Sequence, residues 1–379
     1  MKKILFLPFL TIPTGHHSVA NALISSLKKR IQGEFASIDF LSYFSPRLER
    51  AVTNLYLNWI SYSPATYNWA YDYFAYPSSS TKYRQVYESL FLTKMQRLLS
   101  EEQPDLIVCT QAYPSLLISC LKVQGKIKTP VINVYTDFFI NNIWGRRGID
   151  YHFVADVPLK NELVQKYGVP KHQVFITGIP VDEWLVPTAR QQKLFPPYRI
   201  LIAGGNNGLG DMNELLQALK NSPDFYCTVL CGNNKRLFTE IISWQIKNIY
   251  PLSYISSKRE MALLYDQVDA IVTKPGGVTI SEALWKRIPI FVYSALPGQE
   301  QFNQQYLTTQ GLVYPITQER PVQEQLLSIL SDKFKQANWR KRVDSYFDRL
   351  ERSAWEKIVE ILDQNQVEVH HIKRRRSYC

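Results

Sequence analysis

Short apolar runs alternate along the chain with segments in which apolar residues recur at helical spacing. Runs rich in β-branched and aromatic side chains predict buried strands, and the helical spacing predicts amphipathic helices. The predicted strands are residues 4–9, 106–109, 131–135, 151–155 and 174–177, then 200–203, 226–231, 270–273 and 290–293. The predicted helices include residues 18–30, 115–123, 159–167 and 342–361. This alternation predicts βα units and parallel sheets.

The strands fall into two sets, which are separated by the proline-bearing connector of residues 178–199. A chain of 379 residues with 45% apolar residues is long enough for two domains, each with its own core. We therefore expect an α/β protein with two doubly wound, Rossmann-like domains that face one another. The expected parts are a first domain, a linker, a second domain, and a final helix with a basic tail, at residues 1–180, 181–198, 199–340 and 341–379.

The first apolar run, residues 4–10, follows two lysines and resembles the start of a signal peptide. We interpret it as a buried strand, because Pro8 interrupts it and TIPTGHH follows instead of a small-residue cleavage site. No segment approaches the roughly 20 apolar residues that span a bilayer. The five cysteines form no CxxC pair and no metal spacing with histidine, which is typical of reduced thiols in a cytosolic protein.

A formal net charge of +11 indicates an acidic partner, either a nucleic acid, a nucleotide phosphate or an anionic membrane surface. No signature of RNA or DNA recognition accompanies the charge, so we expect no nucleic acid partner. The densest basic run is KRRR at residues 373–376. It is either a solvated chain end or an anchor to an anionic membrane, where each basic residue contributes about 1 kcal/mol.

Ligands of doubly wound domains bind beyond the carboxyl ends of the strands, and the first loop at such an end is TIPTGHHSVA, residues 11–20. Gly15 permits a tight turn and Ser18 can cap the next helix, which leaves His16 near free helix amides. These amides favour an anion or a developing negative charge. His16 is therefore either a structural histidine or a residue that touches the substrate.

The second loop is IAGGNNGLGDMNEL, residues 202–215, between a predicted strand and a helix. Its glycines Gly204, Gly205 and Gly208 would let backbone N–H groups approach phosphate oxygens closely. The loop lacks the Lys-Ser/Thr pair of a P-loop and the full dinucleotide spacing, which disfavours an ATPase or an NAD enzyme. The alternative is a plain turn without a ligand.

The third loop, residues 273–307, begins with TKPGGVTISEAL. Gly276, Gly277 and Thr279 form a second helix start that can bind a diphosphate through amides and hydroxyl groups. Glu282 lies one turn into that helix and suits a ribose diol, because a carboxylate beside phosphates is unfavourable unless it binds hydroxyl groups. Groups suited to sugar hydroxyls follow at Gln299, Glu300 and Asn303. Together they predict a site for a nucleoside diphosphate that carries a sugar.

The block from TKPGG to PGQEQFN resembles the donor-site signature of the monogalactosyldiacylglycerol synthase and processive diacylglycerol glucosyltransferase family, part of glycosyltransferase family 28. PTGHHSVANAL is similar to the family's N-terminal Gly-x-Gly-His segment, VYTDFFINNIW to its central Thr-Asp segment, and TGIPV to its interdomain joint. The resemblance runs from about residue 4 to residue 352, and KPGG to PGQE is its most specific part.

The resemblance implies a GT-B fold in which the second domain holds most of a UDP-sugar. It implies that Glu282 binds the ribose, that His16 lies at the acceptor side, and that the final helix crosses back over the first domain. The remaining donor contacts it implies are Lys274, Gly276, Gly277, Thr279, Gln299, Glu300 and Asn303, with Gly204, Gly205 and Gly208 on the opposite side of the cleft.

Two positions depart from the family pattern. Asn141 stands where these enzymes tend to carry the histidine of Thr-Asp-x-x-x-His-x-x-Trp, and Pro13 replaces the first glycine of Gly-x-Gly-His. Asparagine cannot accept a proton at neutral pH. Both departures bear on the identity of the acceptor, and the first bears on activity itself.

The donor chemistry implies direct displacement by an acceptor hydroxyl, with inversion at the anomeric carbon. Helix N-termini and loop amides can stabilise the departing UDP, so we expect no metal and no further cofactor. A general base contributes about 10²- to 10⁴-fold. We expect His16 in this role and Asp137 as the second candidate. His17 is a weaker alternative, because adjacent loop residues point in different directions.

Residues 40–76 are rich in Tyr, Trp and Phe, which is typical either of a packed helical core or of a surface at the bilayer interface. Neighbouring Arg47 and Arg50 suit lipid head groups. Together with the basic tail, this pattern favours a lipid acceptor. The resemblance implies diacylglycerol, in a bacterial enzyme that is peripheral on the inner face of the cell membrane.

Three classes of function remain open. The first is a UDP-sugar hexosyltransferase that acts on a lipid, with glucose favoured over galactose by the resemblance alone. The second is another GT-B enzyme, either a UDP-sugar 2-epimerase or a transferase with a non-lipid acceptor. The third is a UDP-sugar sensor that has lost transferase activity at Asn141. The sequence does not choose the hexose, because fine side-chain placement distinguishes hydroxyl epimers.

Overall fold

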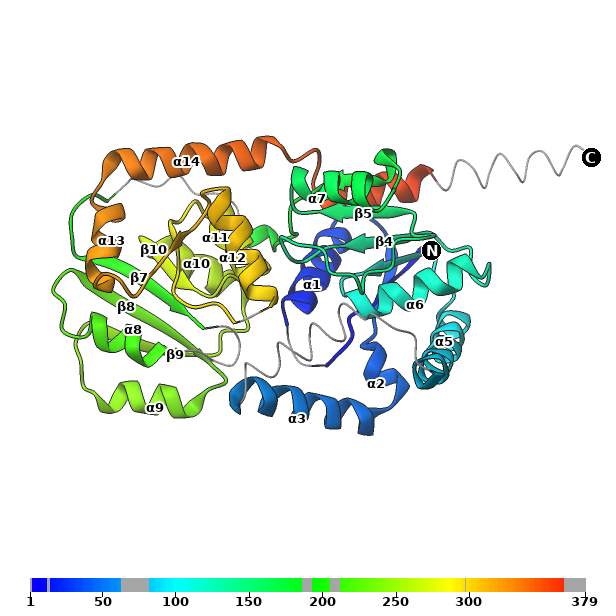
Figure 1. Ribbon diagram of the computed structural model, residues 1–379, viewed down its shortest axis with the longest axis horizontal. Helices are drawn as coiled ribbons and strands as arrows, with labels where there is room; N and C mark the ends of the chain where they lie inside the picture. Colours follow the sequence, from blue (N-terminus) through cyan, green and yellow to red (C-terminus); the bar gives the residue numbers. More distant parts are fainter. Residues whose placement is uncertain are drawn as a thin grey trace, which may run out of the picture.

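The computed structural model describes residues 2–11, 14–62, 82–185, 193–204, 212–296 and 298–364. It has two lobes, each built around a six-stranded parallel sheet covered by helices (Figure 1). The predicted α/β class with two doubly wound domains is confirmed. Strands of the first sheet lie between residues 2 and 176, and strands of the second between residues 198 and 315.

The first sheet has the strand order β2-β1-β3-β4-β5-β6. Its strands are β1 Lys2–Phe6, β2 Gly33–Ser37, β3 Leu106–Cys109, β4 Val131–Val134, β5 Tyr151–Val154 and β6 Val174–Ile176. Its helices are α1 Gly15–Lys28, α2 Phe40–Phe44, α3 Pro46–Tyr62, α5 Lys82–Glu102, α6 Ala112–Val123 and α7 Val157–Asn161, which continues as a π-helical turn at Glu162–Lys166. The first apolar run is thus a buried inner strand, as interpreted from the sequence.

The second sheet has the order β12-β11-β10-β7-β8-β9. Its strands are β7 Tyr198–Ala203, β8 Phe225–Gly232, β9 Ile249–Ser253, β10 Ala270–Thr273, β11 Ile290–Val292 and β12 Tyr314–Pro315. Its helices are α8 Met212–Leu219, α9 Lys235–Ser243, α10 Lys258–Gln267, α11 Gly277–Trp285, α12 Gln299–Thr309 and α13 Val322–Leu330. Sequence patterns missed the edge strands β2, β9 and β12, which are short or half exposed.

Each sheet has one point at which successive strands switch from one side to the other. In the first sheet β1 lies between β2 and β3, and in the second β7 lies between β8 and β10. Crevices that bind ligands form at such switch points, beyond the carboxyl ends of the strands. The segments that leave these ends carry His16 after β1, Gly204 after β7, and Lys274 to Gly277 after β10. The topology therefore brings all three predicted loops to ligand-binding edges.

Helix α1 begins three residues earlier than the sequence predicted. It starts at Gly15, and Thr14 in an extended conformation is its N-cap residue, although the Thr14 side chain makes no capping hydrogen bond to the helix backbone. The predicted cap at Ser18 is wrong, because Ser18 lies inside the helix and its N–H donates to the Thr14 carbonyl (3.1 Å). His16 therefore lies in the first turn of α1, where the helix constrains its backbone, and not in the preceding loop.

The predicted single helix at residues 342–361 is wrong, because two helices replace it. Helix α14 Lys333–Asp348 crosses from the second lobe toward the first, and residues 354–364 form a second helix on the first lobe (Figure 1). Between them Glu351 N–H donates to the Ile176 carbonyl (2.8 Å). Ser353 and Glu356 then form a reciprocal capping box that starts the second helix.

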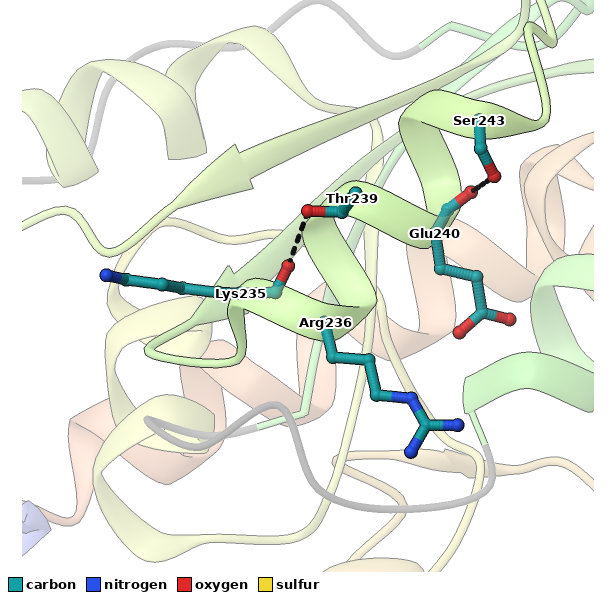
Figure 2. A pocket seen from close by; sticks show the side chains of 5 residues that line it. All are labelled: Lys235, Arg236, Thr239, Glu240 and Ser243. Atoms are coloured by element: carbon teal, nitrogen blue, oxygen red, sulfur yellow. Dashed lines mark hydrogen bonds between the residues drawn. The ribbon is translucent and has the colours of Figure 1, made fainter.

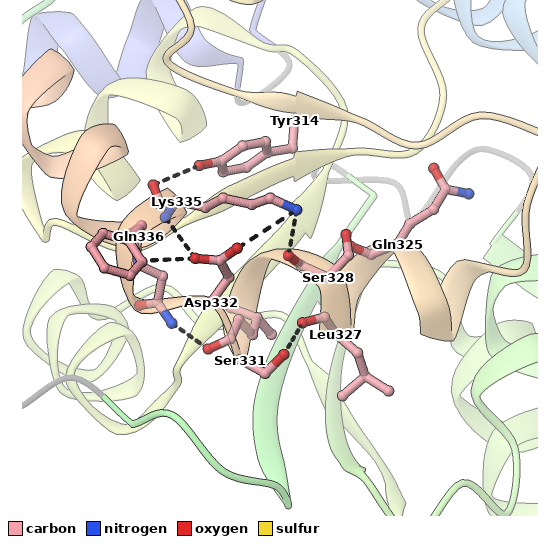
Figure 3. Close-up of polar contacts among 10 residues, drawn as sticks. Tyr314, Gln325, Leu327, Ser328, Ser331, Asp332, Lys335 and Gln336 are labelled. Atoms are coloured by element: carbon pink, nitrogen blue, oxygen red, sulfur yellow. Dashed lines mark hydrogen bonds and ion pairs between the residues drawn. The ribbon is translucent and has the colours of Figure 1, made fainter.

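The start of α14 is held by a polar network at its junction with α13 (Figure 3). Asp332 accepts hydrogen bonds from the N–H groups of Phe334 (2.9 Å) and Lys335 (3.0 Å), as an N-cap does. The Lys335 ammonium donates to the Ser328 carbonyl (2.9 Å) at the end of α13. These contacts set the direction in which α14 leaves the second lobe.

The two lobes share one apolar core. This core runs from the first sheet across the domain boundary to α10, α11 and one face of the second sheet, and it includes Ile179 and Ile280. A separate core on the other face of the second sheet includes residues of α8, α9 and α13. The helix at residues 354–364 adds Ile358 and Leu362 to the shared core. Burial of this apolar area favours contact between the domains.

Candidate active site

His16 is fixed by two contacts from the first domain. Its Nδ1 lies 2.9 Å from the carbonyl oxygen of Thr110 and 2.8 Å from the hydroxyl oxygen of Thr136. A carbonyl oxygen only accepts, so Nδ1 carries the proton and Nε2 keeps its lone pair. Burial lowers the pKa of His16, and the negative charge of Asp137 opposes that shift. The imidazole is therefore neutral at pH 7 and oriented to accept a proton at Nε2.

His17 has a different environment from its neighbour. Its Nε2 lies 2.7 Å from a carboxylate oxygen of Asp39, and its Nδ1 lies 3.1 Å from the Thr14 hydroxyl oxygen. Both ring nitrogens thus have partners within the first domain. These contacts tie the start of α1 to the end of β2, which suits a structural histidine.

Asp137 follows β4 and contacts the second domain. Its Oδ1 accepts a hydrogen bond from Nδ2 of Asn303 on α12 (2.9 Å). The Asn303 Oδ1 in turn accepts from the N–H of Phe138 (2.8 Å), and the Asn303 side chain is buried, with 1% exposure. The sequence predicted that Asn303 contacts a sugar hydroxyl. In the structure its amide forms hydrogen bonds with Asp137 and Phe138 of the first domain.

The two glycines before and at the start of α11 have opposite surroundings. A Cβ atom built on Gly276 meets no atom within 4 Å, whereas one built on Gly277 would lie 2.1 Å from the Thr136 carbonyl oxygen. The N-cap residue of this helix is Gly276, which contributes no capping side chain, so the first N–H groups can bind an anion beside Gly276 and half-buried Thr279. Gly277 is required by the close approach of the first domain, and its contact with a diphosphate stays a prediction.

Glu282 on α11 is held from behind by α10. The Tyr265 hydroxyl donates to its Oε2 (3.1 Å), and the Lys258 ammonium lies 3.6 Å from its Oε1. Burial raises the pKa of Glu282, while Lys258 and Tyr265 act in the opposite direction. Sequence reasoning missed Lys258 and Tyr265, because nothing in the local pattern of α10 reveals a partner on α11.

The N-terminus of α12 carries two further predicted donor contacts. Gly298 has φ +89°, a conformation that favours glycine, and it turns the chain into α12. Gln299 and Glu300 follow, both half-buried. Glu300 accepts a hydrogen bond from Leu296 N–H (2.6 Å) and lies 4.0 Å from the Lys274 ammonium, while burial raises its pKa. Glu300 therefore also stabilises its own loop.

The remaining predicted residues lie at the edges of this region. Gly204 is buried at the end of β7, whereas Gly205 and Gly208 lie outside the described residues. Asn141 is buried, with 7% exposure, and its Oδ1 accepts from Ile143 N–H (3.1 Å) within the same turn. Its amide thus has a local structural contact at the position where the family pattern has histidine.

The acceptor-side and donor-side predictions meet at the domain boundary. A Cβ atom built on Gly15, beside His16, would lie 3.0 Å from the Val278 side chain of α11. The first turns of α1 and α11 are therefore in contact, and α1 lies beside the α11 and α12 pair in Figure 1. A neutral imidazole thus lies close to an uncapped helix N-terminus, which can stabilise a leaving anion while the imidazole takes a proton.

Two other features of the described residues bear on ligand chemistry. An open hollow of about 640 Å³ follows α9, between Lys235 and Ser243, and contains none of the predicted site residues (Figure 2). The Thr239 hydroxyl there donates to the Lys235 carbonyl (3.0 Å), so the helix satisfies it. Within the described ranges no three His, Cys, Asp or Glu side chains gather as metal ligands, and metal independence stays a prediction.

None of the helices in the described part of the chain combines the length and the hydropathy needed to cross a bilayer. Four cysteines, Cys109, Cys120, Cys227 and Cys231, are free thiols, and Cys379 lies outside the described residues.

Comparisons with known proteins match both halves of the chain. The family model described as monogalactosyldiacylglycerol (MGDG) synthase matches residues 16–181, and the glycosyltransferase family 28 C-terminal domain matches residues 199–351. The uncharacterized glycosyltransferase YkoN of Bacillus subtilis (strain 168) is 39% identical over 355 residues, which cover 92% of this chain and 94% of YkoN.

A processive diacylglycerol beta-glucosyltransferase of Bacillus cereus (strain B4264) is 28% identical over 366 residues, which cover 94% of this chain and 93% of that protein. Among solved structures, Acinetobacter baumannii MurG aligns with a TM-score of 0.61 at 16% identity, over 96% of this chain and all of that one. The fold is therefore the GT-B fold, as expected from the sequence.

Proposed function

Because this chain belongs to glycosyltransferase family 28, we propose that it transfers a hexose from a UDP-sugar to a lipid hydroxyl. Diacylglycerol is the favoured acceptor and glucose the favoured sugar, since a relative over nearly the full chain is named as a diacylglycerol glucosyltransferase. The structural observation that carries the proposal is the contact between the first turns of α1 and α11, which sets His16 beside an uncapped helix N-terminus.

The proposed reaction is a single displacement. The acceptor hydroxyl gives its proton to Nε2 of His16 while its oxygen bonds to the anomeric carbon of the sugar. The bond from that carbon to the UDP oxygen breaks, and UDP leaves with both bonding electrons. Amides at the start of α11 stabilise the negative charge of UDP, so the mechanism needs no bound metal. Attack opposite the leaving group inverts the anomeric centre.

On the donor side, Glu282 is proposed to bind the ribose diol. Tyr265 donates to one carboxylate oxygen of Glu282, and the other oxygen lies 3.6 Å from the Lys258 ammonium. Gly276 leaves room for a diphosphate, and Thr279 offers a hydroxyl group one helical turn before Glu282. Lys274 and Gln299 complete the polar surface toward the sugar.

The same fold offers a surface for the lipid. Helix α3 begins with exposed Arg47, Leu48 and Arg50, which suit the head groups and the boundary of an anionic membrane. Between them Glu49 is buried and accepts hydrogen bonds from the N–H (3.3 Å) and hydroxyl of Thr11. This contact ties α3 to the segment that leads to His16.

Peripheral binding to the inner face of the cell membrane follows as part of the proposal. The rest of the aromatic segment, residues 63–81, and the basic tail, residues 365–379, lie outside the described residues. We expect binding to anionic vesicles that weakens as salt increases, because screening reduces attraction between the basic residues and the lipid.

The test incubates the purified protein with radiolabelled UDP-glucose or UDP-galactose and mixed vesicles of diacylglycerol and an anionic lipid. Label in the organic phase supports the proposal and identifies the sugar. UDP-sugar binding without lipid product, measured by calorimetry, would refute the lipid acceptor and leave a soluble acceptor or a sensor. The variants His16→Ala and Asp137→Asn test the base, and full turnover in both would refute that assignment.

A further inference from the structure

One face of α12 is turned toward the first domain. Phe302 packs against Phe139, with ring centroids 5.4 Å apart, and Tyr306 stacks on Phe138 at 5.5 Å. Asn303 lies between these aromatic pairs and bonds to Asp137 and Phe138. Residues 137–139 of the first domain thus all contact α12 of the second domain.

The direction of the Asn303 amide follows from its partners. The Phe138 N–H can only donate, so the atom that faces it at 2.8 Å is the carbonyl oxygen of Asn303. The amide nitrogen must then face Asp137, where it donates to Oδ1 at 2.9 Å. Asn303 is almost fully buried, with 1% exposure, so its amide is largely removed from solvent.

We propose that Asn303 is a positioning residue, which holds the Asp137 carboxylate beside His16 from the opposite domain. This inference rests on the proposed roles of His16 and Asp137 in proton transfer. In this proposal Asn303 is not itself a catalytic residue. It acts through Asp137, and it makes the geometry of the acceptor side depend on contact between the domains.

Charge supports this arrangement. The hydroxyl of Thr136, the residue before Asp137, lies 2.8 Å from Nδ1 of His16, and the Asp137 carboxylate opposes the fall in the pKa of His16 that burial causes. Glu300 on α12 also feels the charge of Asp137. A fixed carboxylate beside His16 would stabilise the imidazolium that forms when His16 takes the acceptor proton.

Helix α12 links this effect to the donor. Its first residues, Gln299 and Glu300, are the proposed sugar contacts, and Asn303 follows one turn later on the same helix. A displacement of α12 therefore moves the donor contacts and Asp137 together. The Asp137 carboxylate therefore has this hydrogen bond only when the helix that carries the donor contacts is docked on the first domain.

The first experiment needs no catalytic turnover. Histidine-labelled full-length protein is titrated by NMR as wild type, Asn303→Ala, Asp137→Asn and the double variant, and His16→Ala identifies the His16 signal. We expect His16 to titrate at lower pH in both single variants, because each removes or releases the carboxylate that favours the imidazolium. We expect Asn303→Ala to add no shift in the Asp137→Asn background. An unchanged His16 titration in Asn303→Ala would overturn the proposal.

The second experiment separates positioning of Asp137 from simple packing. Asn303→Asp keeps the size of the side chain and the oxygen that accepts from Phe138, but it replaces the donor to Asp137 with an oxygen. We expect kcat at pH 8 to fall about 10- to 100-fold with little change in KM for the donor, since small misplacements of reacting groups cost this much. The deficit should shrink at lower pH, because two adjacent carboxylates can share a proton that restores the hydrogen bond.

Tyr306→Phe is the matched control, because Tyr306 lies on α12 one turn after Asn303 and also contacts the first domain. The change removes the hydrogen bond that the Tyr306 hydroxyl donates to Asp156 and keeps the ring stacked on Phe138. Wild-type kcat in Asn303→Asp at pH 8, or an equal loss in Tyr306→Phe, would show that Asn303 only packs the interface. A wild-type protein that makes no lipid product would refute the proposed function, while the His16 titration would still decide the role of Asn303.

Discussion

Replacement of Gly277 by alanine is expected to separate the domains locally at the active site. The added Cβ would lie 2.1 Å from the Thr136 carbonyl oxygen and 3.0 Å from Ile179. An ordinary contact begins near 3.4 Å, so the Thr136 segment must retreat by about 1.3 Å. Overpacking of this kind costs about 1–3 kcal/mol, and the better helix propensity of alanine returns at most about 1 kcal/mol.

The displaced segment is the one that holds the candidate base. The Thr136 hydroxyl contacts His16, and Asp137 follows directly. A misplacement of about 1 Å costs on the order of 100-fold in rate, so we expect Gly277→Ala to lower kcat by about that factor. The assay measures initial transfer rates, with thermal unfolding and UDP affinity measured on the same preparations.

Gly276→Ala is the control for this prediction. Its Cβ meets nothing within 4 Å, and its backbone angles, φ −75° and ψ 131°, are open to alanine. We expect wild-type stability and, because Gly276 is the proposed neighbour of the diphosphate, weaker UDP binding. Wild-type kcat and stability in Gly277→Ala, or an equal loss of stability in Gly276→Ala, would refute the steric argument.

Three further outcomes are expected. Burial lowers the pKa of His16, so the acid limb of the kcat profile should lie below pH 6.5, and a limb above this value would exclude His16 as the base. Burial raises the pKa of Glu282, so its contribution to stability is lost as pH rises from 4.5 through the folded-state pKa. The free energy of unfolding of Glu282→Gln minus that of wild type should therefore increase over that pH range, and the variant should bind UDP more weakly than wild type does. A pH-independent difference in thermal unfolding between the two proteins would contradict this. Arg349→Ala should lower the free energy of unfolding, measured by chemical denaturation, by about 2–3 kcal/mol. Fully buried Asp156 would lose two hydrogen bonds from Arg349 and keep those from Tyr306 and Val157. An unchanged free energy of unfolding would contradict this.

Much of the fold was predictable because local patterns decide it. Buried parallel strands are continuous apolar runs, so β1, β3, β4, β7 and β10 were all located from the sequence. The break after α14 was also predictable in principle, since Ser353 and Glu356 have the spacing of a capping box. The edge strands were not, because β2 and β9 are half exposed and lack such runs.

Some features of the candidate site were likewise predictable from the sequence, and others were not. The loops that leave β1, β7 and β10 were predictable, because parallel strands bring their carboxyl ends to one edge and Gly-rich helix starts favour anions. His16 was predictable as a candidate from its place after β1. Its tautomer was not, because this depends on the Thr110 carbonyl 94 positions away.

The sequence by itself determined the α/β class, the two doubly wound domains and the loops that leave β1, β7 and β10. Only the tertiary structure distinguished Gly276, which faces open space, from Gly277, which faces Thr136. Only the tertiary structure showed that Asn303, a candidate sugar contact, is a partner of Asp137, which lies 166 positions earlier in the chain. The physical reason is that strands, turns and helix starts depend on neighbouring residues, whereas steric fit and hydrogen-bond partners between domains depend on atoms that only folding brings together.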